Sequence, residues 1–329
     1  MRILTGDEVD AALDDVALVD RLEAMFRDGC EMPTRHHHTI AAPNGPGSAD
    51  ATLLLMPAWT RGGPGSGAGR VGIKVVTVFP DNGRRALPAI YGQYLLLDGA
   101  TGRTLAMLDG TMLTKRRTAC ASGLAARFLA PVGARKLLVI GTGALAPQLA
   151  RVHAKVRPID EVMIWGRRTE AAATLAGDLA DSLPRALGRP VTVRAVGDRG
   201  AAVGEADIVS CATLSKEPLV EGKWLRPGQH VDLVGAYTPQ MRESDDAAVQ
   251  RARVYVDTRA GALKEGGDLV QPLQDGAIVP GHVVGDLHDL SRGTVAGRAA
   301  GDVSTITLFK SVGAALEDLA AAELAITAR

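Results

Sequence analysis

Apolar residues in the first third of the chain come in short runs separated by turns rich in glycine and proline. Such runs predict strands that pair with one another without helices between them. We expect these strands at 51–57, 71–79, 90–97 and 103–108, with RGGPGSGAG at 61–69 as a flexible turn. This part of the chain therefore predicts an antiparallel or mixed sheet.

Apolar residues with helical spacing lie on both sides of this group of strands. Thr5 and Glu8 form a T-x-x-E capping box, and the apolar positions that follow predict one helix over 5–28. A second helix is expected from 114 to 129. The stretch from 303 to 326 is amphipathic to apolar, and we expect it to form a helix that returns to the first domain.

From residue 135 to 290 the pattern alternates between strand and helix. The predicted strands are 136–140, 161–165, 191–195, 207–211, 230–234 and 253–256. This alternation is typical of an α/β fold with a doubly wound parallel sheet of the Rossmann type. Because a chain of 329 residues exceeds the size at which a single core keeps growing, we expect two domains.

The first strand of this region ends in a G-x-G-x-x-A turn, formed by Gly141, Thr142, Gly143, Ala144, Leu145 and Ala146. Gly141 allows a tight turn, and Gly143 lets the backbone approach a pyrophosphate. The helical pattern that follows offers free N–H groups and the positive end of a helix dipole to phosphates. In this strand, turn and helix context, the motif predicts a dinucleotide-binding site.

The end of the second strand bears on the choice of cofactor. An acidic residue there usually accepts the ribose hydroxyls of NAD, but this chain has Arg167 and Arg168 after Trp165-Gly166. Two guanidinium groups suit a 2′-phosphate, so we expect NADP to be preferred and NAD to be possible. The alternative is a pair of solvated arginines at a helix start. Thr213 and Ser215 follow the 207–211 strand and are expected to face the cofactor, unless they only form a turn.

Composition argues against several other classes of protein. Lys+Arg and Asp+Glu are balanced at 37 each, and aromatic residues make up 3%, so we expect no nucleic-acid partner. The three cysteines, Cys30, Cys120 and Cys211, have no paired or metal-binding spacing. The three adjacent histidines at 36–38 cannot all face one metal on a strand, so no metal site is expected. With no signal peptide or long apolar run, the sequence predicts a soluble cytoplasmic protein without membrane contact.

Eight segments spread over nearly the whole chain carry a family resemblance: PTR at 33–35, GIKVVTVFPDN at 72–82, LT..RTA.ASGLAA at 113–126, VIGTGALA at 139–146, AT.S at 212–215, PG.HVDLVGAYTP..RESD at 227–245, GDL at 285–287 and ITLFKSVGAALEDL at 306–319. The resemblance is to the ornithine cyclodeaminase/μ-crystallin family. It implies a Rossmann domain plus an α+β domain for substrate binding and dimerisation. We expect the latter at 1–125, completed by the helix at 303–329, and the Rossmann domain at 126–302. A homodimer is also implied.

The resemblance implies that three basic residues, Arg35, Lys74 and Arg117, bind the substrate carboxylate. A forked guanidinium group fixes the plane of a carboxylate and so places the neighbouring carbon for hydride exchange. Lys74 lies in an apolar strand, where a charge is costly without a partner. From the residues alone, Lys74 could instead point outward from an alternating strand, and Arg117 could be a solvated helix residue.

One position separates activities within the family. Ornithine cyclodeaminases place an aspartate shortly before the proline of the LVGAYTP segment, whereas this chain has Ala236 and Tyr237 there. A normal phenol is a poor base at neutral pH, although Tyr237 can still form hydrogen bonds. Of the nearby acids, Asp232 is expected to be structural and Asp245 to begin a helix.

These residues favour a reductase of cyclic ketimine acids. The expected substrates are the small molecules Δ1-pyrroline-2-carboxylate and Δ1-piperideine-2-carboxylate, which would yield L-proline and L-pipecolate, with Lys74 as the first choice of proton donor. An ornithine cyclodeaminase or an alanine dehydrogenase on the same scaffold is the alternative enzyme. A non-catalytic, NADP-dependent binding protein of the μ-crystallin type is the alternative of another class.

Overall fold

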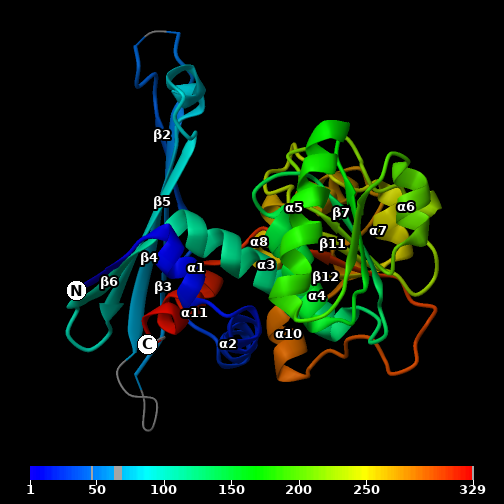
Figure 1. Cartoon of the computed structure of the whole chain (residues 1–329). Helices are drawn as coiled ribbons and strands as arrows, with labels where there is room; N and C mark the ends of the chain where they lie inside the picture. Colours follow the sequence, from blue (N-terminus) through cyan, green and yellow to red (C-terminus); the bar gives the residue numbers. More distant parts are fainter. Residues whose placement is uncertain (46, 63–68, 328–329) are drawn as a thin grey trace. The chain divides into compact units, whose positions relative to one another are not determined.

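The computed structural model describes residues 1–45, 47–62 and 69–327, so most of the expected turn at 61–69 lies outside the described residues. The chain forms two compact units (Figure 1). The first unit contains Met1–Arg117 and Ala315–Arg329, and the second contains Thr118–Ala314. The expected division after residue 125 and the boundary between the units both lie within helix α3 (Gly110–Leu129).

The first unit is built on a six-stranded mixed sheet, as predicted. Only β1 and β6 are parallel, and the other neighbours are antiparallel. Two short edge strands were not predicted, because one has three residues and the other is polar and exposed along its length. The order across the sheet is β1 (Arg2–Leu4), β6 (Thr104–Asp109), β5 (Ile90–Asp98), β4 (Arg70–Val78), β3 (Ala51–Trp59) and β2 (His36–Ile40).

The prediction of one helix over 5–28 is wrong, because the chain forms two. The capping box of Thr5 and Glu8 is confirmed at the start of α1 (Gly6–Ala12). Leu13 is then extended, and the Asp14 carboxylate accepts hydrogen bonds from two backbone N–H groups of the next helix, α2 (Asp15–Asp28). A second N-cap within the apolar pattern therefore divides the helix.

The prediction of one helix over 303–326 is also wrong. Residues Thr307–Lys310 form β14, a strand of the second unit, and helix α11 (Ala315–Thr327) begins only afterwards. All four residues of β14 are buried, and a short run of this kind cannot be told from a buried helix by periodicity. Helix α11 belongs to the first unit, where it packs on α2 and on β3, β4 and β5.

The second unit contains an eight-stranded, fully parallel sheet, which confirms the predicted doubly wound fold. From β7 the chain builds outward through β8 to β9, and it then returns to place β10 on the other side of β7. Ligands bind at the carboxyl ends of strands beside such a switch point. The strand order is β13 (Val283–Asp286), β12 (Arg253–Val256), β14, β11 (His230–Leu233), β10 (Ile208–Cys211), β7 (Lys136–Ile140), β8 (Glu161–Trp165) and β9 (Thr192–Ala195).

Helices cover both faces of this sheet (Figure 1). One buried apolar cluster joins the sheet to α4 (Ala146–Val156) and α5 (Thr169–Leu187). A second cluster joins it to α6 (Arg199–Glu205), α7 (Asp246–Arg251), α8 (Arg259–Glu265) and α9 (Gly267–Gln274). A short helix, α10 (Leu287–Arg292), follows β13. Among the described helices of either unit, none is long and apolar enough to cross a membrane.

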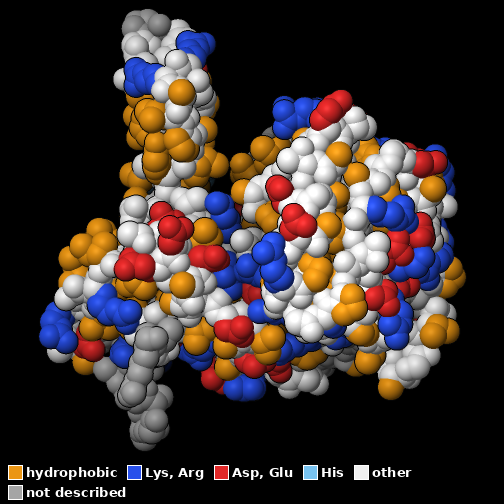
Figure 2. All heavy atoms as spheres, in the orientation of Figure 1, with side chains coloured by type: hydrophobic (Ala, Val, Ile, Leu, Met, Phe, Trp, Pro, Cys, Tyr) orange, Lys and Arg blue, Asp and Glu red, His pale blue; other side chains and the backbone are white. Residues whose placement is uncertain are grey.

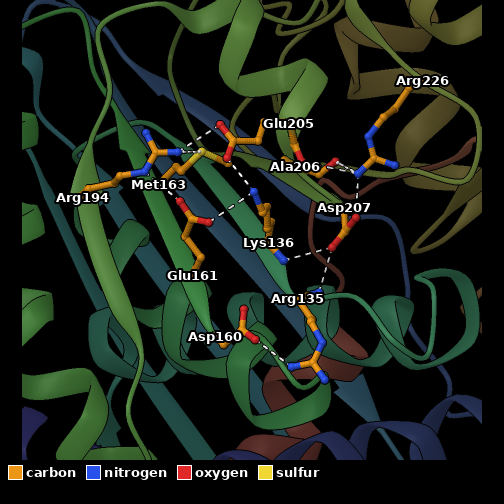
Figure 3. A network of polar contacts seen from close by, with 10 residues as sticks. All are labelled: Arg135, Lys136, Asp160, Glu161, Met163, Arg194, Glu205, Ala206, Asp207 and Arg226. Carbon is orange, nitrogen blue, oxygen red and sulfur yellow. Dashed lines mark hydrogen bonds and ion pairs between the residues drawn. The ribbon is translucent and has the colours of Figure 1, made fainter.

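The amino ends of the parallel strands carry a network of ion pairs (Figure 3). Its shortest contacts include Lys136 Nζ to Glu205 Oε1 at 2.7 Å and Arg226 Nη2 to Asp207 Oδ1 at 2.6 Å. Four basic and four acidic side chains make up the network: Arg135, Lys136, Arg194, Arg226, Asp160, Glu161, Glu205 and Asp207. Because its charges balance, the network stabilises this edge of the sheet, and the G-x-G turn lies at the other edge.

Candidate active site

Lys74 lies in the interior of the first unit. It is on β4, is 2% exposed, and its Nζ is 2.8 Å from Asp318 Oδ2 on α11. The same Nζ donates a hydrogen bond to the hydroxyl of Thr114 at 3.4 Å. The alternative that Lys74 points outward from an alternating strand is therefore wrong.

Arg117 joins the same cluster from helix α3. Its Nε donates to Asp318 Oδ1 at 2.9 Å, and its Nη1 donates to Glu317 Oε2 at 2.7 Å. The residue is 5% exposed, so the alternative of a solvated helix residue is wrong. The two carboxylates come from adjacent positions of α11 and hold the guanidinium group from two sides.

Arg35, the third predicted cation, directly precedes β2 and is half-buried. Its charge acts on Lys74, whose pKa it helps to lower. The structure thus brings the three cations together in the first unit, with Glu317 and Asp318 among them. Sequence reasoning missed these two acids, although EDL in the family segment 306–319 and the cost of burying Lys74 were signals for them.

The charges of this cluster suit the binding of an anionic group and the transfer of a proton. Burial lowers the pKa of Lys74 to about 8, with Asp318 opposing the shift and Arg117 and Arg35 adding to it. Burial by itself would raise the pKa of Asp318, but Lys74 and Arg117 hold it below its usual value. Three cations and two carboxylates leave a net charge of +1, which one substrate carboxylate would neutralise.

The G-x-G turn of the second unit has the geometry of a phosphate cradle. Gly141 has φ +123°, and a Cβ added to it would lie 2.6 Å from the carbonyl oxygen of Ala212. A Cβ added to Gly143 would meet nothing within 4 Å, so the backbone there is open to a ligand. Leu145, the N-cap of α4, forms no side-chain cap hydrogen bond. The N–H of Ala146 donates to the carbonyl oxygen of Gly143, and Pro147 has no N–H, so a pyrophosphate would meet the backbone of the turn and the positive end of the α4 dipole.

The other predicted cofactor residues lie at the same edge of the sheet. Arg167 and Arg168 follow β8 and are exposed, which leaves their guanidinium groups accessible to a phosphate. Thr213 follows β10, and both its backbone N–H and its hydroxyl donate to Glu243. The Ser215 hydroxyl donates to the carbonyl oxygen of Glu217 at 2.7 Å and so forms part of a local turn. Their roles toward a cofactor stay predictions.

Strand β11 and the segment after it show three further features. Ala236 is buried, whereas Tyr237 is 44% exposed. Asp232 is fully buried and accepts hydrogen bonds from the hydroxyls of Ser122 at 2.9 Å and Ser210 at 2.6 Å. Asp245 is the N-cap of α7, as predicted. The acids near Tyr237 in sequence are thus used within the fold, and Glu243 in this segment was missed by sequence reasoning.

The chain is similar to known proteins over most of its length. The chain is 42% identical over 326 residues to an uncharacterised protein of Schizosaccharomyces pombe, covering 98% of this chain and 96% of that protein. It is 41% identical over 301 residues to a Δ1-pyrroline-2-carboxylate reductase of Paracoccus denitrificans, covering 91% and 89%. This second relative is named for the reduction of an imine.

Two solved structures share the fold over nearly the whole chain. One is a Δ1-pyrroline-2-carboxylate reductase of Thermococcus litoralis in complex with NADH and L-proline, with a TM-score of 0.86, 30% identity and coverage of 99% and 97%. The other is an archaeal alanine dehydrogenase dimer with bound NAD, with a TM-score of 0.86, 26% identity and coverage of 99% and 95%. The sequence model of the ornithine cyclodeaminase/mu-crystallin family matches residues 3–327, and this chain belongs to that family.

Proposed function

We propose that this protein reduces cyclic ketimine acids, such as Δ1-pyrroline-2-carboxylate and Δ1-piperideine-2-carboxylate, to L-proline and L-pipecolate. The observation that carries the proposal is the buried cluster of Lys74 and Arg117 with Asp318, which has Arg35 beside it. Its net positive charge suits one carboxylate. The relatives named as reductases of this substrate class support it.

In this proposal, the substrate carboxylate binds Arg117 and Arg35, and the imine nitrogen faces Lys74. A bound nicotinamide cofactor would supply the hydride that adds to the carbon of the C=N bond. Lys74 supplies the proton that the nitrogen needs, and its pKa of about 8 keeps it protonated at neutral pH while allowing the transfer. Asp318 holds Lys74 in place, since their atoms are 2.8 Å apart.

The residues before Pro239 support reduction over cyclisation. Neither Ala236 nor Tyr237 offers a carboxylate, and Ala236 is buried. Cyclisation of ornithine in this family relies on an aspartate near this position to take up protons. A reductase needs no such base, because its substrate already contains the C=N bond.

We further propose that the second unit prefers NADPH over NADH. The exposed Arg167 and Arg168 at the end of β8 support this preference, as does the lack of an acid at that position. The structure of the Thermococcus litoralis relative contains NADH, which makes NADH the alternative cofactor. The open backbone at Gly143 and the positive end of the α4 dipole fit the pyrophosphate of either.

A homodimer formed through the first unit is also proposed. Figure 2 shows hydrophobic side chains gathered along the end of the six-stranded sheet where β2 lies. They include Ile40, Leu87, Ile90 and Tyr91, which are 37%, 49%, 48% and 46% exposed. An exposed apolar patch of this kind marks an interface, and the related alanine dehydrogenase is a dimer. Within the described residues the three cysteines form no disulfide, which supports a cytoplasmic location.

The proposed activity is tested by oxidation of NADPH and NADH in parallel with both cyclic imines and with pyruvate plus ammonia, and ornithine is incubated separately with NAD⁺ and assayed for released ammonia. We expect turnover with the imines and NADPH. Release of ammonia from ornithine without imine reduction would make the protein a cyclodeaminase, and turnover only with pyruvate plus ammonia would make it an alanine dehydrogenase.

A second experiment separates an enzyme from a binding protein. Arg117→Ala should abolish imine reduction while cofactor binding is retained, since Arg117 lies in the first unit. Arg103→Ala, an exposed arginine of the same unit, serves as the control. Cofactor binding by the wild type without turnover of any substrate would instead indicate a non-catalytic role.

A further inference from the structure

A buried carboxylate joins the two loops that follow β10 and β11. Glu243 is fully buried, and its Oε1 accepts hydrogen bonds from the backbone N–H of Thr213 at 2.6 Å and from the Thr213 hydroxyl at 2.9 Å. Its Oε2 accepts from the backbone N–H groups of Gly235 at 2.7 Å and Ala236 at 3.3 Å. One side chain therefore holds two loops at the carboxyl edge of the sheet.

The two loops also touch each other directly. A Cβ added to Gly235 would lie 1.9 Å from the carbonyl oxygen of Thr213 and 2.2 Å from its nitrogen, so this approach requires glycine. The carbonyl oxygen of Ala212 also lies close to Gly141 of the G-x-G turn, at 2.6 Å from an added Cβ. Small movements of the 212–215 loop would therefore change the proposed cofactor site.

Residues of α9 and β14 hold the backbone of Glu243 in place. The Oδ1 atom of Asp268 accepts hydrogen bonds from the backbone N–H groups of Glu243 at 2.7 Å and Ser244 at 2.9 Å. The Oδ2 atom of Asp268 lies 3.2 Å from Nζ of Lys310, and both residues are fully buried. This framework fixes the backbone of Glu243, so its carboxylate can set the positions of the loops.

We propose that Glu243 is a positioning residue. As a carboxylate, it fixes the 212–215 loop against the 234–237 turn in the arrangement that binds the nicotinamide cofactor. When Glu243 takes up a proton, this arrangement loosens. The inference rests on the proposed cofactor site, but not on which imine is reduced. A protonated carboxyl group carries an O–H donor, whereas the N–H and hydroxyl of Thr213 and the N–H groups of Gly235 and Ala236 already point at Glu243. Protonation therefore displaces one of these backbone N–H groups or turns the Thr213 hydroxyl from donor to acceptor, and it removes the charge that strengthens the remaining bonds.

The charged and titratable groups around Glu243 bring this proton uptake into the neutral range. Burial raises the pKa of Glu243 to about 7, and the charge of Asp268 on α9 adds to this shift. The charge of Lys310 on β14 and a hydrogen bond from Cys211 of β10 oppose it. Asp257, at the end of β12, also interacts with Lys310. The carboxylate form of Glu243 therefore gives way to the acid form as the pH falls through about 7.

The test measures NADH binding to the full chain by fluorescence between about pH 6 and about pH 8.5, because the phosphates of NADH do not titrate there, unlike the 2′-phosphate of NADPH. The wild-type Kd should rise about tenfold toward the acid end, as expected for the loss of a hydrogen bond to a charged group. Glu243→Gln should show the weak binding at every pH, since its amide presents N–H groups where acceptors are needed.

Matched variants test whether the effect on the Kd depends on the position of the acid, on its charge or on the stability of the fold. Glu205→Gln removes an acid from the opposite edge of the same sheet and should keep the wild-type profile (Figure 3). Glu243→Asp keeps the charge and should keep a pH-dependent Kd. The proposal is overturned if Glu243→Gln retains the wild-type pH profile, or if it changes only the melting temperature. If Glu243→Gln does not fold, a wild-type Kd for NADH that does not change with pH overturns the proposal. Because no imine is present, failure of the reductase assignment would not affect this result.

Discussion

The Nζ of Lys74 lies 2.8 Å from Oδ2 of Asp318, although the two residues are 244 positions apart in the chain. Both side chains are shielded from water, and Asp318 also binds Arg117 at 2.9 Å. Two of the cations proposed to bind the substrate, Lys74 and Arg117, are therefore already oriented by acids before any substrate arrives. This preorganisation reduces the entropy that binding must overcome.

Imine reduction should slow as the pH rises through about 8. Lys74 must be protonated to supply a proton, and the pKa of Lys74 is lowered to about 8 by burial. Above that pH, kcat should fall by about tenfold per pH unit, while oxidation of L-proline should become faster. The measurement is kcat against pH in both directions, and an alkaline limb unchanged in Lys74→Arg would assign the proton to another group.

Asp318→Asn should move that alkaline limb to lower pH. The charge of Asp318 raises the pKa of Lys74, so its removal lowers this pKa further. The variant should also lose about 3–5 kcal/mol of stability, because it leaves two buried cations with less counter-charge. Urea unfolding and the pH profile test both effects. Asp28→Asn, an exposed acid of the same unit, should leave the two measurements unchanged.

Arg167→Ser together with Arg168→Ser should reverse the proposed cofactor preference. Loss of charge-assisted hydrogen bonds to a 2′-phosphate should raise the KM for NADPH by about 10- to 100-fold and leave that for NADH nearly unchanged. The comparison uses initial rates with each cofactor. Arg185→Ser, on the exposed face of α5, is the control, and equal effects on both cofactors would contradict the assignment.

The second unit should lose stability in mild acid through His230. Burial lowers the pKa of His230 to about 3, with Asp232 opposing the shift and His153 adding to it. The unfolded chain takes up a proton near pH 6.5 that the folded chain does not, so stability falls from about pH 6.5 toward pH 3. His230→Asn should flatten this decline in urea unfolding, whereas the exposed His37→Asn should not. An identical slope in both variants would exclude His230 as the source.

Periodicity and the glycine motif were sufficient to predict the parallel sheet and its G-x-G turn, because both depend on local pattern. The interruption at Leu13 and Asp14 and the strand Thr307–Lys310 were missed, since a second cap and a fully buried strand leave little trace in periodicity. The basic cluster could be predicted only through the family resemblance. Its acids, Glu317 and Asp318, lie far away in sequence, and only the cost of an unpaired buried lysine pointed to a partner.

The position of α11 also bears on how the chain folds during synthesis. This helix leaves the ribosome after every strand of both sheets, and it carries the acids that neutralise Lys74 and Arg117. A nascent chain therefore carries the sheet of Met1–Arg117 without its covering helix and its counter-charges throughout the synthesis of the second unit. The basic cluster is assembled only after almost the whole chain has been made.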